Sequence, residues 1–450
     1  MNISKDQLGK AITNKFLKNL YKKLLIEEAD RDSLLENLFQ KLSKKAYFPQ
    51  NPDRILSYDK GNGVLRFVPI LSRDDYLVYM FCISAIDDFL AEHRVEGTYG
   101  GWSLSCAMRR KETDDATFFD QNTTIDEPSP CSNTMNKHAY IQHFGEYNAK
   151  IKEYIDFFEG KDGIGIAKID IANFYDSIRL DILEDAIRET VPSDYSEIIN
   201  CLFFFLKNWN KKLQSYKPQT VGIPQEYIGD CSRILSNFYL QKYDLEIKNY
   251  CEKLGGYYLR YADDQIFIAD KEQLRQIIAK ASYILLSIGL NINAQKVKVF
   301  DSIDDYKIFD GFDIKETIDP NLSPAKQSLD DKNNYTEIFL ETERAGLPKK
   351  GFSLAKIIIH MGISSLNNQN RASFIKVLLD EYINELYDER LLKELKEAFT
   401  TTEWELFLDL LIESIAKDIQ NIRRFELLRC GKKLGIDTSW ILEDTLEPIR

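Results

Sequence analysis

The chain lacks the sequence features typical of membrane proteins and of disulfide-rich proteins. Among its 450 residues, no apolar run approaches the length needed to span a bilayer. The start of the chain has no continuous apolar segment, so we expect no secretory signal. The seven cysteines are scattered without a Cys-X-X-Cys pair, and the four histidines do not cluster at ligand spacing. We therefore expect reduced thiols, a location in the cytosol, and neither a zinc site nor a disulfide framework.

Positive charge is also scarce for a protein that would bind nucleic acid. The chain has 59 Lys and Arg residues against 71 Asp and Glu residues, which gives a net charge of −12. This sum argues against a nucleic-acid binder, but binding responds to the local field rather than to the total. Lysine is dense in residues 1–45, and smaller basic clusters follow at Lys349, Lys350, Arg423, Arg424, Lys432 and Lys433. Each cluster fits either a solvated helix face or part of a basic channel.

The rest of the composition is that of an ordinary globular protein. Hydrophobic residues make up 44% and charged residues 29%, and the length suffices for two or three subdomains with a sizeable core. Helical spacing of apolar residues predicts helices in the first 46 residues, at 74–92, at 139–159, and throughout the chain from about 325 onward. The polar stretch 109–137 is expected to be a long surface loop, to which we assign no function.

The most informative stretch is residues 256–269, where two apolar runs flank a short polar centre. The aromatic and β-branched residues predict a β-hairpin with Ala262 to Gln265 at its tip. Asp263 and Asp264 lie in this tip, where adjacent ionised carboxylates repel each other. The pair fits either an ordinary polar turn or a divalent-metal site, because Mg²⁺ takes hard oxygen ligands.

A further acidic residue ends another predicted strand. The apolar run 165–169 reaches Asp170, and a turn then leads into a helix near Leu180. On its own, this aspartate is also explained as a helix cap at a strand-to-helix junction.

Taken together, these stretches resemble reverse transcriptases. Residues 261–264 match the family's Tyr-X-Asp-Asp signature, and residues 170–178 are similar to its first carboxylate motif. The resemblance implies an α+β class with a right-hand polymerase fold, in which fingers and a palm with an antiparallel sheet precede an all-helical thumb and C-terminal region. The expected parts are an N-terminal helical segment at 1–50, fingers at 51–162, a palm at 163–320 with a finger-like helical insertion at 180–219, and the helical region at 321–450.

The resemblance also implies a two-metal active site. Asp170, Asp263 and Asp264 would hold two Mg²⁺ ions, or Mn²⁺ in their place, and the backbone carbonyl of Ile171 would add a ligand. Tyr175 would lie under the sugar of the incoming nucleotide, where its ring leaves no room for a 2′-hydroxyl and so favours DNA synthesis.

Four more residues take roles from the same resemblance. Gln225 in the loop 220–227 would support the nucleotide, and Arg66 and Lys60 on a predicted hairpin at 54–70 would hold its phosphates. Lys296 is a candidate general acid for the leaving pyrophosphate, although a solvated strand explains it equally well. Residues 306–312 resemble the next palm hairpin.

Two departures from the family pattern concern the substrate loop. Glu226 stands where the family has Gly, so the side chain would either obstruct the substrate or form a new contact. Ser232 and Arg233 stand in the region of the usual Ser-Pro element. This variant is similar to bacterial phage-defence reverse transcriptases of the abortive-infection and unknown groups.

The function that the resemblance implies is an RNA-directed DNA polymerase that uses dNTPs and an RNA template and makes a DNA product, in antiphage defence with a dedicated non-coding RNA. Two other enzymes stay open, a retron- or group II intron-derived reverse transcriptase and a protein-primed polymerase that needs no template. An RNA-binding scaffold with a polymerase fold is the non-enzymatic alternative. We expect a bacterial cytosolic protein without membrane partners, and a homo-oligomer stays open.

Overall fold

The computed structural model describes residues 3–60, 63–104, 140–210, 217–227, 229–315, 317–318, 322, 324–346 and 351–446. The predicted loop at 109–137 lies outside these residues, as do Lys349 and Lys350. The chain divides into two compact units, one made of Met1–Arg54 with Val68–Ile303 and the other of Ile55–Phe67 with Asp304–Arg450. No helix among the described residues combines the length and apolar character needed to cross a membrane. Within the same residues, the cysteines at 82, 201, 231, 251 and 430 are free thiols.

The first unit is built on a five-stranded sheet with the strand order β3-β5-β6-β4-β7. Its strands are β3 (Thr98–Tyr99), β4 (Ile164–Asp170), β5 (Tyr257–Tyr261), β6 (Asp264–Asp270) and β7 (Lys298–Phe300). All neighbouring strands are antiparallel except β3, which runs parallel to β5. The predicted α+β class, with an antiparallel sheet followed by a helical region, is therefore confirmed.

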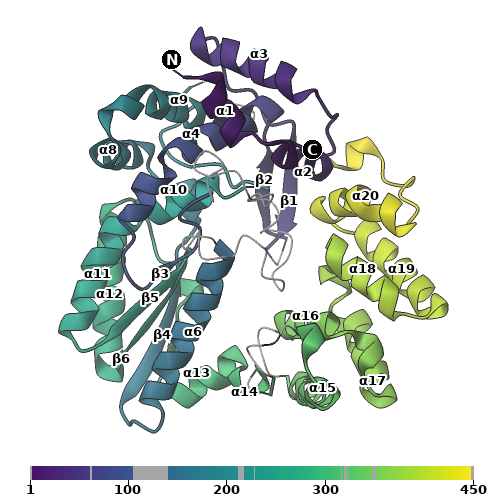
Figure 1. The fold of residues 1–450 in the computed structure, drawn as a ribbon. Helices are drawn as coiled ribbons and strands as arrows, with labels where there is room; N and C mark the ends of the chain where they lie inside the picture. The colour runs from purple at the N-terminus through teal and green to yellow at the C-terminus, as the bar shows by residue number, and fades with distance from the viewer. Residues whose placement is uncertain are drawn as a thin grey trace. The chain divides into compact units, whose positions relative to one another are not determined.

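Helices bury the central strands of this sheet. The helix α12 (Lys271–Ser287) packs on β4 and β6, α11 (Gln241–Lys253) packs on β5, and α6 (Tyr140–Phe158) packs on β3 and β5 (Figure 1). Gly165 allows the close approach of β7, because a Cβ atom at this position would lie 2.7 Å from the carbonyl oxygen of Phe300. Most interior residues of β4 and β6 are apolar and buried, as expected for strands that are covered on both faces, and Lys168 and Gln265 are the polar exceptions.

The remaining helices of the first unit precede the sheet strands or link them. They are α1 (Lys5–Ala11), α2 (Asn14–Leu24), α3 (Arg31–Ser43), α4 (Arg73–Glu92), α7 (Phe174–Ser177), α8 (Leu180–Thr190), α9 (Ser196–Leu206) and α10 (Cys231–Tyr239). Short side chains mark where the first helices begin, since Ser4, Thr13, Asp30 and Ser72 each accept a hydrogen bond from a backbone N–H of the first turn. The helical prediction for the first 46 residues is confirmed.

The second unit combines a hairpin with helices from the end of the chain. The hairpin strands are β1 (Arg54–Asp59) and β2 (Leu65–Ile70). The helices are α13 (Ile303–Asp310), α14 (Phe312–Lys315), α15 (Leu329–Arg344), α16 (Gly351–Met361), α17 (Asn368–Glu381), α18 (Glu389–Ala398), α19 (Thr401–Ala416) and α20 (Ile422–Leu434). The division of the chain at 303/304 differs from the boundary at 320/321 that the sequence suggested.

One buried asparagine explains why the hairpin groups with the helices. The Asn421 Oδ1 atom accepts a hydrogen bond from the Ser57 backbone N–H at 2.7 Å, and Asn421 Nδ2 donates to the Ile55 carbonyl at 3.0 Å. The same amide nitrogen also donates to the Leu446 carbonyl at 2.7 Å. Because all these groups are buried, the asparagine supplies hydrogen bonds that water cannot.

The predicted palm hairpin at 306–312 is wrong. Residues Ile303–Asp310 form the helix α13, and a second short helix begins at Phe312. The apolar residues Ile303 and Tyr306 are three positions apart and both are buried, which is the spacing of one helix face. The helical spacing of these residues therefore outweighs the resemblance to a strand.

Candidate active site

The antiparallel pairing of β4 with β6 brings together the acidic residues predicted for the site. Asp170, the last residue of β4, is the direct cross-strand partner of Asp264, the first residue of β6. Cα atoms of such partners lie about 4.5–5.5 Å apart. Asp263 precedes Asp264 in the turn between β5 and β6, so three carboxylates from two distant stretches of sequence meet at one end of the sheet.

The turn that carries Asp263 is tighter than the sequence suggested. Tyr261 pairs with Asp264, which leaves only Ala262 and Asp263 between the strands. Gln265, expected at the tip, is instead buried inside β6. Ala262 has a φ of 53°, a left-handed conformation that residues with a Cβ atom seldom adopt. Two-residue hairpin turns favour this conformation because it matches the twist of the strands.

The three carboxylates interact electrostatically. Burial, followed by the charges of Asp264 and Asp170, raises the pKa of Asp263 to about 6. Two ammonium groups offset part of the negative charge. Lys296 Nζ lies 2.9 Å from Asp170 Oδ2, and Lys168 Nζ lies 3.3 Å from Asp264 Oδ1. The sequence predicted Lys296 near the active site, and the structure places its ammonium directly on the first carboxylate.

The chemistry of these side chains suits a hard divalent cation. Carboxylate oxygens are the ligands that Mg²⁺ prefers, and a cation would relieve the repulsion that raises the pKa of Asp263. In the part of the chain that the structure describes, no three His, Cys, Asp or Glu side chains already form a metal-binding group. In this structure the ammonium groups of two lysines balance the negative charge of the carboxylates. The side chain of Lys296 is exposed enough to move away from Asp170.

The backbone around Asp170 is fixed by a neighbouring segment. The Asn293 N–H donates to the Asp170 carbonyl at 2.8 Å, and the Ala172 N–H donates to the Asn291 carbonyl at 2.8 Å. Ile171 forms an isolated bridge with Ile292 between these two bonds. The role of the Ile171 carbonyl as a metal ligand stays a prediction.

The substrate loop is held against the helix that follows Asp170. The Ile223 N–H donates to the Tyr175 carbonyl at 3.0 Å, and the Gly222 N–H donates to the Ile178 carbonyl at 2.8 Å. Gly222 has a φ of 93°, which favours glycine. These bonds bring the loop with the half-buried Gln225 beside α7, which carries Tyr175.

Tyr175 lies within electrostatic range of the carboxylates. Burial raises the pKa of its hydroxyl, and the charge of Asp263 acts in the same direction. The charge of Arg233 and a hydrogen bond with Ser236 act in the opposite direction. The tyrosine hydroxyl thus interacts with residues of α10 and with the acidic turn, whereas the contact of the ring with a sugar stays a prediction.

Glu226 forms a new contact rather than a free obstruction. Its Oε2 atom accepts a hydrogen bond from the Ser232 backbone N–H at 2.7 Å, in the first turn of α10. Burial raises the pKa of this carboxyl to about 8. Ser232 Oγ in turn donates to the Pro224 carbonyl at 2.5 Å, so the loop and the helix are bonded twice. The sequence left both outcomes open for Glu226, and the helix N-terminus explains the one observed.

Two predicted phosphate-binding residues belong to the other compact unit. Lys60 and Arg66 are exposed on the hairpin that groups with the C-terminal helices. Their contact with a nucleotide stays a prediction. Conversely, Lys168 was not expected at the site, although it precedes Asp170 by two positions and so shares its face of the strand.

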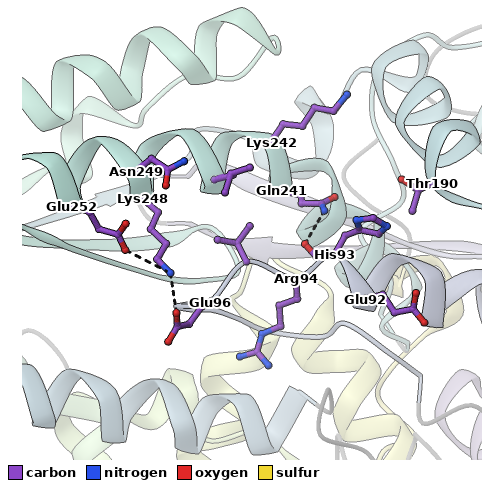
Figure 2. Close-up of a pocket in the computed structure, with 12 residues that line it drawn as sticks. Glu92, His93, Arg94, Glu96, Thr190, Gln241, Lys242, Lys248, Asn249 and Glu252 are labelled. Atoms are coloured by element: carbon purple, nitrogen blue, oxygen red, sulfur yellow. Dashed lines mark hydrogen bonds and ion pairs between the residues drawn. The ribbon is translucent and has the colours of Figure 1, made fainter.

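A separate cavity of about 510 Å³ lies in the first unit, beside α11 (Figure 2). It contains none of the predicted site residues. Three of its charged side chains are paired with one another, since Lys248 Nζ lies 3.1 Å from Glu96 Oε2 and 3.8 Å from Glu252 Oε1. Arg94 and Lys242 pair with acidic residues outside the lining. This pairing leaves the cavity without the concentrated charge that a nucleotide site needs.

The acidic cluster lies within a segment that matches a known protein family. Residues 129–318 match the family model described as reverse transcriptase (RNA-dependent DNA polymerase). This part of the chain is therefore similar to a reverse transcriptase domain. The matched segment includes Asp170, Asp263, Asp264 and Lys296. The match covers less than half of the chain.

Among solved structures, the chain is similar to fungal telomerases. An apo telomerase from Candida tropicalis truncated from its C-terminal domain has 13% identity and a TM-score of 0.36, over 60% of this chain and 55% of that one. A Candida albicans telomerase in complex with a telomeric RNA fragment has 12% identity and a TM-score of 0.37, over 86% of this chain and 66% of that one. The chain thus spans little more than half the length of the first of these proteins.

The raised pKa of Asp263 predicts a pH-dependent effect of its substitution. In metal-free protein, a folded-state pKa of about 6 against an ordinary value of 3.8 means that stability falls as pH rises from about 4 to 6. Asp263→Asn should therefore raise the free energy of unfolding by about 1–3 kcal/mol at pH 7.5, and by much less at pH 4. Urea denaturation in EDTA at both pH values measures this, with the exposed Asp304→Asn as the control. A stabilisation that is equal at both pH values would contradict the predicted titration.

Proposed function

We propose that this protein is an RNA-directed DNA polymerase that makes DNA from dNTPs by two-metal catalysis. The observation that carries the proposal is the cross-strand pairing of Asp170 with Asp264, with Asp263 in the adjoining turn, inside the matched reverse transcriptase domain. When bound, two divalent cations would supply activation of the primer 3′-hydroxyl and stabilisation of charge on the triphosphate.

The chain's own residues would bind the cations and supply a proton. Asp170, Asp263 and Asp264 hold the cations, and the Ile171 carbonyl adds a ligand. Lys296 would donate a proton to the leaving pyrophosphate. Support for this role comes from the 2.9 Å ion pair, which already keeps its ammonium at the reacting centre.

Nucleotide selection would fall to the loop and helix beside the acidic turn. Tyr175 excludes the 2′-hydroxyl, and Gln225 supports the base and sugar. The hydrogen bonds that join Gly222 and Ile223 to α7 support this pairing of roles, because they keep the two residues in fixed register. Arg66 and Lys60 would hold the triphosphate.

For the biological role, we propose antiphage defence in the bacterial cytosol, with a dedicated non-coding RNA as template. The support is the altered substrate loop, in which Glu226 bonds α10, together with the helical region after the sheet. A retron- or intron-derived enzyme, a protein-primed polymerase and an RNA-binding scaffold are the alternatives that the experiments below separate.

Loss of one carboxylate should abolish synthesis. We expect Asp263→Asn to lower primer extension on an RNA template, with Mg²⁺ and dNTPs, by at least about 10³-fold, because removal of an essential catalytic group costs that much or more. The matched control, Asp304→Asn, should keep wild-type activity. If wild type extends neither an RNA-templated primer nor any other primer, the polymerase assignment is wrong and the scaffold takes its place.

The ring of Tyr175 should decide the choice of sugar. Tyr175→Ala should raise the ratio of rNTP to dNTP incorporation by roughly tenfold or more, because the ring no longer fills the space of the 2′-hydroxyl. Tyr175→Phe keeps the ring and should keep the wild-type ratio. Single-nucleotide incorporation kinetics measure both variants. An unchanged ratio in Tyr175→Ala would remove the residue from sugar selection.

The nucleic acid that accompanies the protein should reveal the template. We expect one RNA to co-purify with both wild type and Asp263→Asn, and complementary DNA to appear only with wild type. Sequencing of all RNA and DNA bound to the two proteins tests this. Random or homopolymeric DNA attached to wild type would instead indicate protein-primed synthesis without a template.

A further inference from the structure

A fully buried ion pair lies directly behind the acidic turn. The guanidinium of Arg260 faces the carboxylate of Asp244 in a two-pronged contact, with Nε to Oδ1 at 2.8 Å and Nη2 to Oδ2 at 2.6 Å. Neither side chain is exposed to solvent. Tyr258 donates its hydroxyl to Asp244 Oδ1 at 2.7 Å, so both carboxylate oxygens are bonded.

The remaining nitrogen of this guanidinium reaches the catalytic turn. Arg260 Nη1 donates to the Ala262 carbonyl at 2.8 Å and to Asn237 Oδ1 at 2.7 Å. On the other side of the same residue, the Ala262 N–H donates to the Tyr99 carbonyl at 3.2 Å. The peptide groups on both sides of Ala262, the residue with a φ of 53°, are therefore bonded immediately before Asp263.

Asn237 links this arrangement to a third part of the chain. Its Nδ2 atom donates to the Gly101 carbonyl at 2.7 Å. Gly100, with a φ of 127°, leaves room for this amide, because a Cβ atom there would lie 2.7 Å from Asn237 Nδ2. The guanidinium thus connects α10 and α11 to a single carbonyl of the turn, and Asn237 extends this connection to Gly101, two residues after β3.

Stability alone does not explain such a pair. Removing two charges from water costs several kcal/mol per ion, and apolar residues of similar volume often stabilise a buried site as well or better. A guanidinium differs from an apolar side chain in its fixed fork of donors, which bonds several acceptors in one plane. The ion pair is therefore suited to hold the acceptors of the guanidinium in fixed positions relative to one another.

We propose that Arg260, held by Asp244 and Asn237, is a positioning residue for the catalytic turn. It fixes the Ala262 carbonyl, and through it the direction in which the Asp263 and Asp264 carboxylates face Asp170. This inference rests on the proposed polymerase function and adds three residues that touch neither substrate nor metal.

The test compares two buried arginines of the same chain. Arg260→Lys keeps the charge but loses the fork, so kcat for primer extension should fall between about tenfold and 100-fold, while KM for dNTP changes by less than about threefold. The matched control is Arg423→Lys in the second unit, where the guanidinium is also buried and Arg423 Nη1 bonds Asp418 Oδ2 at 2.8 Å. This control should lose stability and keep its kcat.

A second variant distinguishes the loss of turn positioning from a loss of protein stability. In Asp244→Leu/Arg260→Met, both charges are removed together, so the protein should stay folded with a melting temperature near that of wild type. Its kcat should still fall as in Arg260→Lys. A wild-type kcat in this variant, or equal kcat losses in Arg260→Lys and Arg423→Lys, would overturn the proposal.

Hydrogen exchange gives a readout that does not need activity. In Arg260→Lys, amides of the peptide 258–266 should exchange faster than in wild type, while those of α15 to α19 keep their protection. If wild type itself extends no primer, the proposed function fails, and this exchange pattern still decides the positioning role. Unchanged exchange at 258–266 would overturn it.

Discussion

The register between β4 and β6 is the constraint on which the site depends. Because successive side chains of a strand point to opposite faces, a slip of one residue would turn every side chain of β6 to the other face of the sheet. The pairing of Asp170 with Asp264 would then be lost. The apolar residues inside both strands favour this register, since a slip would break the packing of their side chains on each buried face. The hydrophobic core and the chemistry are thus fixed by the same seven-residue pairing.

This pairing concentrates negative charge, and the surrounding residues offset that charge in two ways. Two lysines, Lys168 and Lys296, bring ammonium groups to the carboxylates from β4 itself and from the segment before β7. A deeper pair, Arg260 with Asp244, contributes no net charge but bonds the backbone of the turn. Lys296 is exposed and able to rearrange, and Lys168 is partly exposed. Arg260 and Asp244 are instead fully buried.

Much of the site could be predicted from the sequence because its signals are local. The two apolar runs and the paired aspartates identify the β5–β6 hairpin, and the apolar run before Asp170 identifies its partner strand. The length of the turn could not be predicted, because Ala262 adopts a conformation that its residue type disfavours. The conformation is held by a bond to the distant Tyr99 carbonyl and by the Arg260 guanidinium, which the distant Asp244 and Asn237 fix in place.

Other errors and omissions also arise from contacts between distant segments. At Ile303–Asp310 a helix forms where the family resemblance implied a hairpin, and its buried face is formed by Ile303 and Tyr306. The contact of Glu226 with α10 depends on where that helix begins. Likewise, nothing near residues 55–67 in the sequence indicates that the hairpin groups with the final helices.

The grouping of the hairpin with the final helices affects how the protein is made. The buried backbone of the hairpin at Ile55 and Ser57 is bonded by Asn421, which a ribosome adds more than 350 residues later. At a synthesis rate of about 5–20 residues per second, the hairpin waits on the order of tens of seconds for this partner. During this interval its strands carry unpaired polar groups, which are prone to pair with other chains. The second unit can therefore be completed only after nearly the whole chain has been translated.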